Sequence, residues 1–442
     1  MGGVEVFEKY LELALRQGAD QAEIYVARGK SLTAEIEKKS VKTCSSTLEE
    51  GAAMRTYING GLGLSYTTIL EEKQLREMVE RSVSAARAAN PDPEFKSLPE
   101  PEELRKVPDI FDSETANTES WVVVDLASEM VRAALQPGGV ESLKGAVSVS
   151  SSEIRVENTL GLEASERRTR FVAWIYVSSK RDSDTATFYD YSIGVKLGEL
   201  DPVKLGEKTA EKAVSLLGGK KVETMTSPVL FEPQASASLI GAVIAALNAD
   251  LVQRRRSFMT GLKGRRIAGE ALNISESGRV EKGFMSRSFD DEGVPTTEKT
   301  VLRRGFLETY LYDTYTANKE GVSSTGNCYR GSFRGLPTIS ASNLRVEPGN
   351  TKVDSMLEDI DRGLIVSIIS GAPNLASGDF SEIVRQGFYI EKGEIVHPIK
   401  YAGIGFNLLD FLSNTKVVSK EYVEYGGSVY PYLLVDNIRV AG

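Results

Sequence analysis

Residues 229–252 read Val229-Leu-Phe-Glu-Pro-Gln-Ala-Ser-Ala-Ser-Leu-Ile-Gly-Ala-Val-Ile-Ala-Ala-Leu-Asn-Ala-Asp-Leu-Val252. The apolar run 229–231 ends at Glu232-Pro233, which predicts a strand, because proline cannot donate a ladder hydrogen bond and disfavours helix in the residue before it. The rest predicts one buried helix with a face of small residues. Its apolar positions recur at helical spacing: Ile240, Ile244, Leu247 and Leu251.

An arginine-rich segment follows this helix, Arg254-Arg-Arg-Ser-Phe-Met-Thr-Gly-Leu-Lys-Gly-Arg-Arg-Ile-Ala268. Clustered arginines and glycines at a helix end predict a turn that exposes cations where the helix dipole favours them. Such a turn could hold a carboxylate or a phosphate. The alternative is an ordinary solvated helix end.

Strand, small-residue helix, paired arginines and the pattern Ser-Phe-x-x-Gly-x-x-Gly-x-x-Ile-Ala at 257–268 resemble the start of the C-terminal domain of the TldD/PmbA family, proteins related to a metallopeptidase. Catalytic members of that family carry HExxxH in this helix, two imidazoles for a metal and a glutamate as general base. They place a cysteine ligand near the C-terminus. The matching positions in this sequence are Gly241, Ala242, Ala246 and Gly426, none of which has a ligand atom.

The resemblance therefore implies the PmbA (TldE)-like branch, without a catalytic group, metal or cofactor in this chain. The sequence has a single histidine, His397, in Glu394-Ile-Val-His-Pro, which is typical of an ordinary strand. Because a catalytic zinc site draws several ligands from His, Cys and carboxylates, one chain cannot assemble a histidine-rich site.

Composition limits the classes of function. The chain has 442 residues and a formal net charge of −9, which argues against nucleic acid as a partner. The apolar run at 239–247 is far shorter than the roughly 20 residues of a membrane span. Residues 1–9 do not resemble a signal peptide, and Cys44 and Cys328 do not imply a disulfide framework. These features predict a cytoplasmic protein.

The length and the element pattern predict an α+β protein in two parts. Residues 1–221 are expected to form helices on an antiparallel sheet, with a hairpin at Asn59-Gly60 and a proline-rich strap at 91–118. Helix, strands and helix occur twice, which suggests a duplication. The strands of the second unit are expected near 147–156 and 170–177, before a helix that begins at Asp201-Pro202.

Residues 222–442 are expected to form a β-rich domain resembling a barrel or a sandwich. Strands are predicted at 286–296, 301–312 and 363–369, and a single helix near 407–412.

Several polar motifs allow two interpretations. The run 290–293, Asp-Asp-Glu-Gly, suits a cation site or simply a turn, and the resemblance assigns it to the framework of the domain. Tyrosines at 310, 312 and 315 suit a peptide groove or core packing. The match to family patterns at 378–381 suggests a polar strand near a cleft. The residues expected in a groove or an interface are Arg254, Arg255, Asp290, Asp291, Tyr315 and Asp379.

The leading hypothesis is a metal-free subunit that partners an HExxxH-bearing TldD-like paralogue in processing unfolded peptides. The alternative is a non-enzymatic homodimer that binds peptides or a small ligand. A third hypothesis, hydrolysis by another group of this chain, has no candidate residue to support it. Neither nucleic acid nor membrane is expected as a partner.

Overall fold

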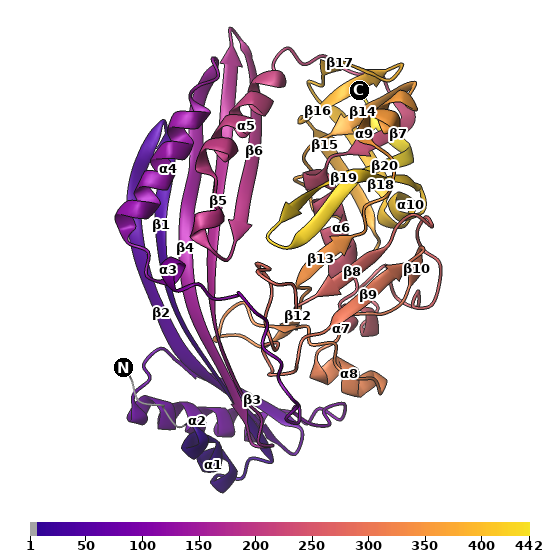
Figure 1. The fold of residues 1–442 in the computed structure, drawn as a ribbon. Helices are drawn as coiled ribbons and strands as arrows, with labels where there is room; N and C mark the ends of the chain where they lie inside the picture. The colour runs from indigo at the N-terminus through magenta and orange to yellow at the C-terminus, as the bar shows by residue number, and fades with distance from the viewer. Residues whose placement is uncertain (1–6) are drawn as a thin grey trace.

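The computed structural model describes residues 7–442, and two large β-sheets dominate it (Figure 1). The first six residues, on which the expectation about a signal peptide partly depends, lie outside the described residues. Across residues 7–442, no helix has the length and apolar character needed to cross a membrane. The mixture of antiparallel sheet with helices and a strand-rich C-terminal half confirms the predicted α+β class.

The first sheet has six antiparallel strands in the order β3-β2-β1-β4-β5-β6. Its strands are β1 (Gln21–Lys38), β2 (Ser40–Ile58), β3 (Gly61–Thr67), β4 (Val140–Asn158), β5 (Glu163–Arg181) and β6 (Asp184–Gly194). The associated helices are α1 (Glu8–Arg16), α2 (Glu72–Ala88), α3 (Ser113–Ala116), α4 (Ser120–Ala134), the 3-10 turn η1 (Leu197–Glu199) and α5 (Pro202–Ser215). Helix, three strands and helix thus occur twice, and β1 pairs with β4 at the centre, as a duplication would place them.

Both ends of this long sheet are covered by helices. At one end α1 and α2 bury an apolar face against β1 and β2, and at the other end α4 and α5 cover β1, β4 and β5 (Figure 1). The predicted start of α5 is confirmed, since the Asp201 carboxylate accepts the Lys204 N–H and Pro202 occupies the first turn. The predicted hairpin is also confirmed, with φ of 50° at Asn59 and 81° at Gly60.

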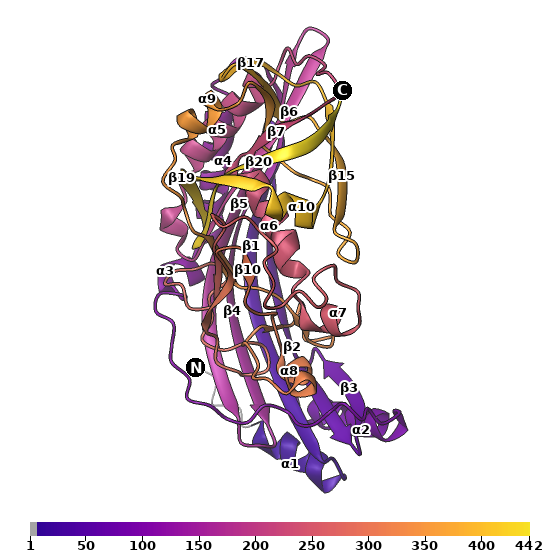
Figure 2. The same cartoon turned by 90° about the vertical axis from the view of Figure 1, so that its right-hand side faces the viewer.

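Residues 91–112 of the predicted strap have no helix or strand and run along the molecule from α2 to α3 (Figure 2), whereas α3 itself lies within the predicted range 91–118. Its apolar residues Leu98, Val107 and Ile110 are buried. The Asn158 side chain donates to the Pro99 carbonyl, and Ser288 Oγ accepts the Val107 N–H. The strap therefore contacts both the first sheet and the 286–296 loop of the C-terminal half.

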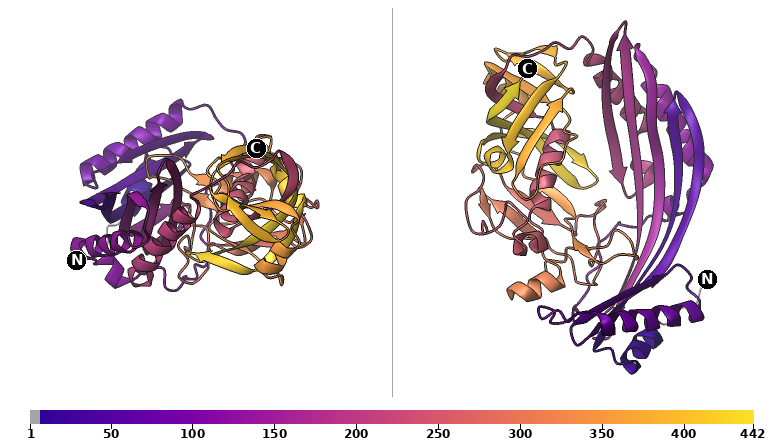
Figure 3. Two further views of the ribbon diagram at one scale, coloured as in Figure 1. Left: turned by 90° about the horizontal axis from the view of Figure 1, so that it is seen from above. Right: turned by 180° about the vertical axis from the view of Figure 1, so that it is seen from behind.

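The C-terminal half forms a twelve-stranded mixed sheet that curls around α6 (Figure 3). Its strands are β7 (Met225–Phe231), β8 (Ile274–Ser277), β9 (Glu298–Arg303), β10 (Phe306–Leu307), β13 (Asn343–Val346), β14 (Arg362–Val366), β15 (Asp379–Val384), β16 (Gly387–Glu391), β17 (Glu394–Pro398), β18 (Ala402–Asn407), β19 (Thr415–Tyr425) and β20 (Ser428–Ala441). A separate pair is β11 (Cys328–Tyr329) and β12 (Thr338–Ile339). The helices are α6 (Pro233–Ala245), α7 (Ala249–Gln253), α8 (Thr314–Glu320), α9 (Val353–Glu358) and α10 (Leu408–Ser413).

The strand at 229–231 is confirmed as the end of β7, which lies between β14 and β20 in the sheet interior. The single helix expected at 234–252 is wrong, because α6 and α7 are separate. Asn248 interrupts them: its side chain accepts the N–H groups of Asp250 and Leu251 and caps α7. The side chain thus competes with a continuous helix.

Two further expectations for this half are wrong. Residues 286–296 form a buried loop and not a strand. The Asp290 carboxylate accepts the backbone N–H groups of Glu292 and Cys328, which in a sheet would bind the carbonyls of a neighbouring strand. The predicted helix near 407–412 is confirmed as α10, with Asn407 as its cap, but it is not alone after α7, since α8 and α9 also lie there.

Candidate functional site

A cavity of about 400 Å³ lies beside α6, the helix that corresponds to the catalytic helix of the resembled family. Gly241, Ile244 and Ala245 of α6 form one wall, and residues 339–342 form the opposite wall. The cavity exists at this point partly because Gly241 has no side chain: a Cβ there would meet no atom within 4 Å. Most of the lining is apolar, as in sites that bind small molecules or apolar side chains.

The four positions matched to the family's metal site offer no donor atom to this cavity. Gly241 lines it, Ala242 is half-buried and Ala246 is fully buried in the core. Gly426 lies in the turn between β19 and β20, where its carbonyl accepts the N–H of Phe284, the neighbour of the lining residue Met285.

These side chains do not fit a metal, since hydrogen and methyl groups cannot ligate one. Within residues 7–442, no three His, Cys, Asp or Glu side chains are grouped so that they could hold a metal ion. His397 lies on β17, where its ring stacks on Tyr389 with 5.2 Å between the ring centroids. That packing is the ordinary strand role expected from the sequence.

The structure does not gather the expected groove residues into one site. Arg254 pairs with Asp250 on α7, 2.8 Å apart, and the exposed Arg255 has a left-handed φ of 56°. Tyr315 donates its hydroxyl hydrogen bond to Asp92 of the strap at 2.8 Å. Asp379 is exposed at the start of β15, and its carboxylate accepts from the Asn407 side chain.

The neighbouring tyrosines pack in the core. The Tyr310 hydroxyl donates to the Met259 carbonyl at 2.7 Å, and the buried Tyr312 donates to Glu320 at 2.9 Å. Of the two interpretations left open by the sequence, core packing is the one these contacts support for Tyr310 and Tyr312.

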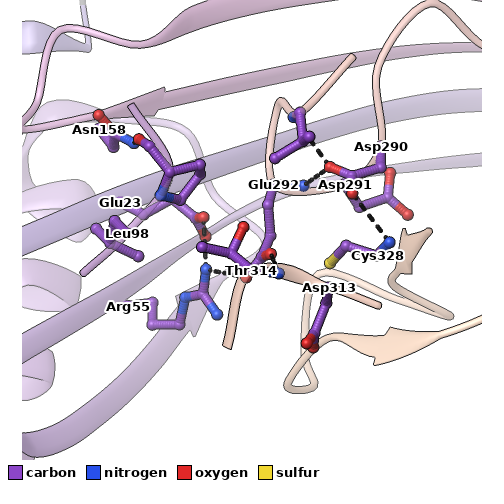
Figure 4. Close-up of polar contacts among 12 residues, drawn as sticks. Glu23, Arg55, Leu98, Asn158, Asp290, Asp291, Glu292, Asp313, Thr314 and Cys328 are labelled. Carbon is purple, nitrogen blue, oxygen red and sulfur yellow. Dashed lines mark hydrogen bonds and ion pairs between the residues drawn. The ribbon is translucent and has the colours of Figure 1, made fainter. Parts of the chain in front are cut away.

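A second candidate feature is a cluster of buried charges between the two sheets (Figure 4). Arg55 of β2 donates to Glu23 of β1 at 2.7 Å and to Glu292 of the C-terminal half at 2.8 Å. Arg330 also binds Glu23, and all four side chains are at most 5% exposed. Since each carboxylate meets a guanidinium, the cluster joins the halves by paired charges and not by apolar packing alone.

Asp290 and Asp291 lie at the edge of this charged cluster. Asp290 accepts the N–H groups of Glu292, Val294 and Cys328 at 2.9 to 3.0 Å. Asp291 accepts from the Arg330 N–H at 2.7 Å and from Arg287 at 3.2 Å. Both carboxylates therefore hold the 286–296 loop in shape.

Burial and the nearby Glu292 charge raise the pKa of Asp290 to about 8. Against the cost of burial, the charge and hydrogen bond of Arg55 lower the pKa of Glu292. Burial and the surrounding carboxylates raise the pKa of the Cys328 thiol, which therefore makes a poor nucleophile at neutral pH.

Sequence reasoning found the loop carboxylates but missed Glu23, Arg55 and Arg330. One signal was available in the sequence. Glu23 is the charged residue within the apolar strand segment 22–26, and a charge at such a position can indicate that both faces of the strand are buried. In the C-terminal half, the partner of Glu23 is 307 residues away and the partner of Arg55 is 237 residues away, so no local pattern could identify them.

Comparisons with known proteins identify the family of this chain. Three domain profiles of one family match the chain: "PmbA/TldA metallopeptidase domain 1" at residues 22–86, its central domain at 110–217 and its C-terminal domain at 224–442. The metalloprotease PmbA of Escherichia coli O157:H7 is 26% identical over 443 residues, which cover 99% of this chain and 96% of that protein.

Solved structures show the same fold. A putative modulator of a DNA gyrase from Thermotoga maritima superimposes with a TM-score of 0.90 at 26% identity, covering 99% of this chain and 100% of that one. TldE from Thermococcus kodakarensis gives a TM-score of 0.90 at 23% identity, covering 99% and 100% of the two chains.

Fold and site together define a class, a metallopeptidase-like α+β chain without the HExxxH sequence, since its one histidine cannot supply two. The chain belongs to the PmbA/TldD family, and within that family to the PmbA (TldE)-like branch.

Proposed function

We propose that this chain is the metal-free subunit that accompanies an HExxxH-bearing paralogue in the proteolytic processing of unfolded peptides in the cytoplasm. The observation that carries the proposal is the cavity beside α6, the helix that the resemblance matches to the family's catalytic helix, in which Gly241 stands where a ligand would be expected. A role in holding peptide needs such a cavity and needs no metal in the same chain.

In this role the cavity receives an apolar side chain of the peptide while the paralogue supplies the metal and the general base. The apolar wall formed by Ile244, Leu251 and Leu311 excludes water from such a side chain. The exposed arginines after α7 follow the wall residue Leu251 closely in the sequence. In this role they bind the partner subunit or a carboxylate of the peptide.

Co-expression with the HExxxH paralogue of the same genome tests the proposal. We expect the two chains to purify together, and an unfolded peptide to be cleaved by the mixture but not by this chain alone. Gly241→Leu should reduce cleavage by filling the cavity without preventing copurification. Gly198→Leu is the matched control, since a Cβ at Gly198 also meets no atom within 4 Å, in a different part of the chain.

Failure to purify together, combined with peptide binding by this chain alone and no cleavage, would instead favour the non-enzymatic homodimer. Metal-dependent cleavage by the isolated chain would contradict both functions.

A further inference from the structure

Arg170 of β5 is a half-buried cation whose charged end has no partner. Its side chain projects from the face of the first sheet that is turned away from α4 and α5 and toward the C-terminal half (Figure 1). Its Nε donates to the Phe284 carbonyl at 2.8 Å, and the guanidinium lies 5.1 Å from the centroid of the Phe284 ring. Among residues 7–442, no group forms a hydrogen bond or an ion pair with its two terminal nitrogens. The guanidinium is therefore fixed in direction while its fork of donors stays free.

The surroundings of Arg170 contain an uncompensated positive charge. Burial and the charges of nearby Arg168 and Arg287 lower the pKa of Arg170 to about 10. Asp291 pairs with Arg287 at 3.2 Å, and Glu166 lies 3.8 Å from Arg168. These two carboxylates compensate two of the three guanidiniums and leave Arg170 without a counter-charge.

Further polar groups without a partner lie beside Arg170. Arg168 is buried, and its Nε has no hydrogen-bond partner in the part of the chain that the structure describes. On the neighbouring strand β4, Ser150 is opposite Arg170 and Ser152 is opposite Arg168. Both serines are partly exposed, and residues opposite one another in an antiparallel pair lie on the same face of the sheet. Guanidinium nitrogens and hydroxyl groups are thus gathered at one place on this face.

We propose that Arg170, together with Arg168 and the two serines, binds the C-terminal carboxylate of a peptide. A carboxylate carries a single negative charge, which equals the missing charge, and its two oxygens match the planar fork of a guanidinium. Asp290 does not supply this charge, since its pKa of about 8 keeps it mostly protonated at neutral pH. The binding of a carboxylate follows from these charges, whereas its assignment to a peptide rests on the proposed function.

The position of Arg170 relative to the cavity beside α6 favours a peptide as the source of the carboxylate. Phe284, which accepts from Arg170 Nε, is followed in the chain by Met285, and Met285 lines that cavity. The carboxylate site and the cavity are thus linked by two consecutive residues. In this arrangement the peptide lies with its C-terminal end at the first sheet, so the chain selects the ends of unfolded peptides over their internal segments.

Fluorescence anisotropy of this chain alone tests the inference with a labelled peptide that ends in leucine and with the C-terminal amide of the same peptide. We expect the wild-type chain to bind the free acid at least about tenfold more tightly than the amide, because only the acid forms a charge-assisted pair with Arg170. Arg170→Gln should bind the acid and the amide equally.

Arg167→Gln is the matched control. Arg167 lies on the same strand and its guanidinium is 4.1 Å from the centroid of the Phe111 ring, but its side chain projects from the opposite face of the sheet. This variant should keep the wild-type preference for the free acid.

Competition on the wild-type chain tests the inference even where Arg170→Gln does not fold. Acetate should displace the free-acid peptide at a lower concentration than inorganic phosphate does. Equal binding of acid and amide by the wild-type chain, an unchanged preference in Arg170→Gln, a lost preference in Arg167→Gln, or displacement first by phosphate would each overturn the inference. Failure to copurify with the paralogue would contradict only the proposed function, because these measurements use this chain alone.

Discussion

Asp290 shows how burial decides what a carboxyl group does in this protein. The Asp-Asp-Glu sequence at 290–292 would suit a cation in an exposed loop, but here the three residues are at most 3% exposed and bind backbone N–H groups and arginines. The raised pKa of Asp290 means that the folded protein holds a proton that the unfolded chain releases at neutral pH.

This proton makes stability depend on pH. The pKa of Asp290 is raised from 3.8 to about 8, so the free energy of unfolding falls as pH rises from about 4 to 8 and is constant above that range. Burial raises the pKa values of Asp190 and Asp313 to about 6. The decrease in the free energy of unfolding that each of these two groups causes is therefore complete by about pH 6. The window from pH 6 to 8 therefore reports mainly on Asp290.

We expect the urea midpoint of the wild-type chain to fall between pH 6 and 8, and Asp290→Asn to show a smaller fall because it has no carboxyl proton to lose. Urea unfolding at several pH values measures the difference. Exposed Asp359→Asn should keep the wild-type slope. An unchanged slope in Asp290→Asn would contradict a raised pKa for Asp290.

Among the elements, α6 is the one on which the interpretation of the site depends. Helical glycines normally mark close approaches, and Gly206 of α5 is an example, since a Cβ there would lie 2.3 Å from the Met130 carbonyl of α4. Gly241 of α6 is different because the space beside it is open. The two glycines thus form a natural pair for comparison.

We expect Gly241→Ala to stabilise the chain by up to about 1 kcal/mol, because alanine favours helix and meets no obstacle. Gly206→Ala should destabilise it by about 1–3 kcal/mol, because the added methyl group pushes α4 and α5 apart. Thermal unfolding measured by circular dichroism distinguishes the two signs. Loss of stability in Gly241→Ala would show that the space beside α6 is filled.

The elements that could be predicted from the sequence are those with local signals. Asp201-Pro202 at the start of α5, Asn59-Gly60 between β2 and β3, and the apolar end of β7 each fix their own conformation. The break between α6 and α7 depends on the bridge between Asn248 and Leu311 and on the capping side chain, and the loop at 286–296 depends on Cys328 and Arg330. These distant contacts override the local pattern.

In the molecule as a whole, the docking of the two halves is the feature that sequence could not show. The cluster formed by Glu23, Arg55, Glu292 and Arg330 joins them at one end. Stacked rings of Tyr191 and Tyr425, 4.8 Å between centroids, bring β6 and β19 together elsewhere. Composition and element order predict two parts, but neither contains information on which faces meet.

We expect residues 222–442, produced alone, to unfold at lower urea than the whole chain, because Glu292 and Arg330 lose their partners. Addition of residues 1–221 should restore much of the difference. Arg55→Met in the 1–221 fragment should weaken binding between the fragments roughly 100-fold, since it leaves the buried Glu292 carboxylate without its guanidinium partner, while Glu23 keeps only Arg330. If 222–442 alone were as stable as the intact chain, the charged cluster would contribute nothing to docking.

The separation of Glu23 and Arg330 along the chain also has a consequence for synthesis. The 307 residues between them take roughly 15–60 s to translate at about 5–20 residues per second. Throughout that interval the nascent first sheet carries an acid and a base whose burial is not yet possible, so they stay hydrated. The two halves therefore dock only after Arg330 has been translated. A translational pause before codon 330 prolongs the exposure of Glu23 and Arg55 to chaperones and proteases.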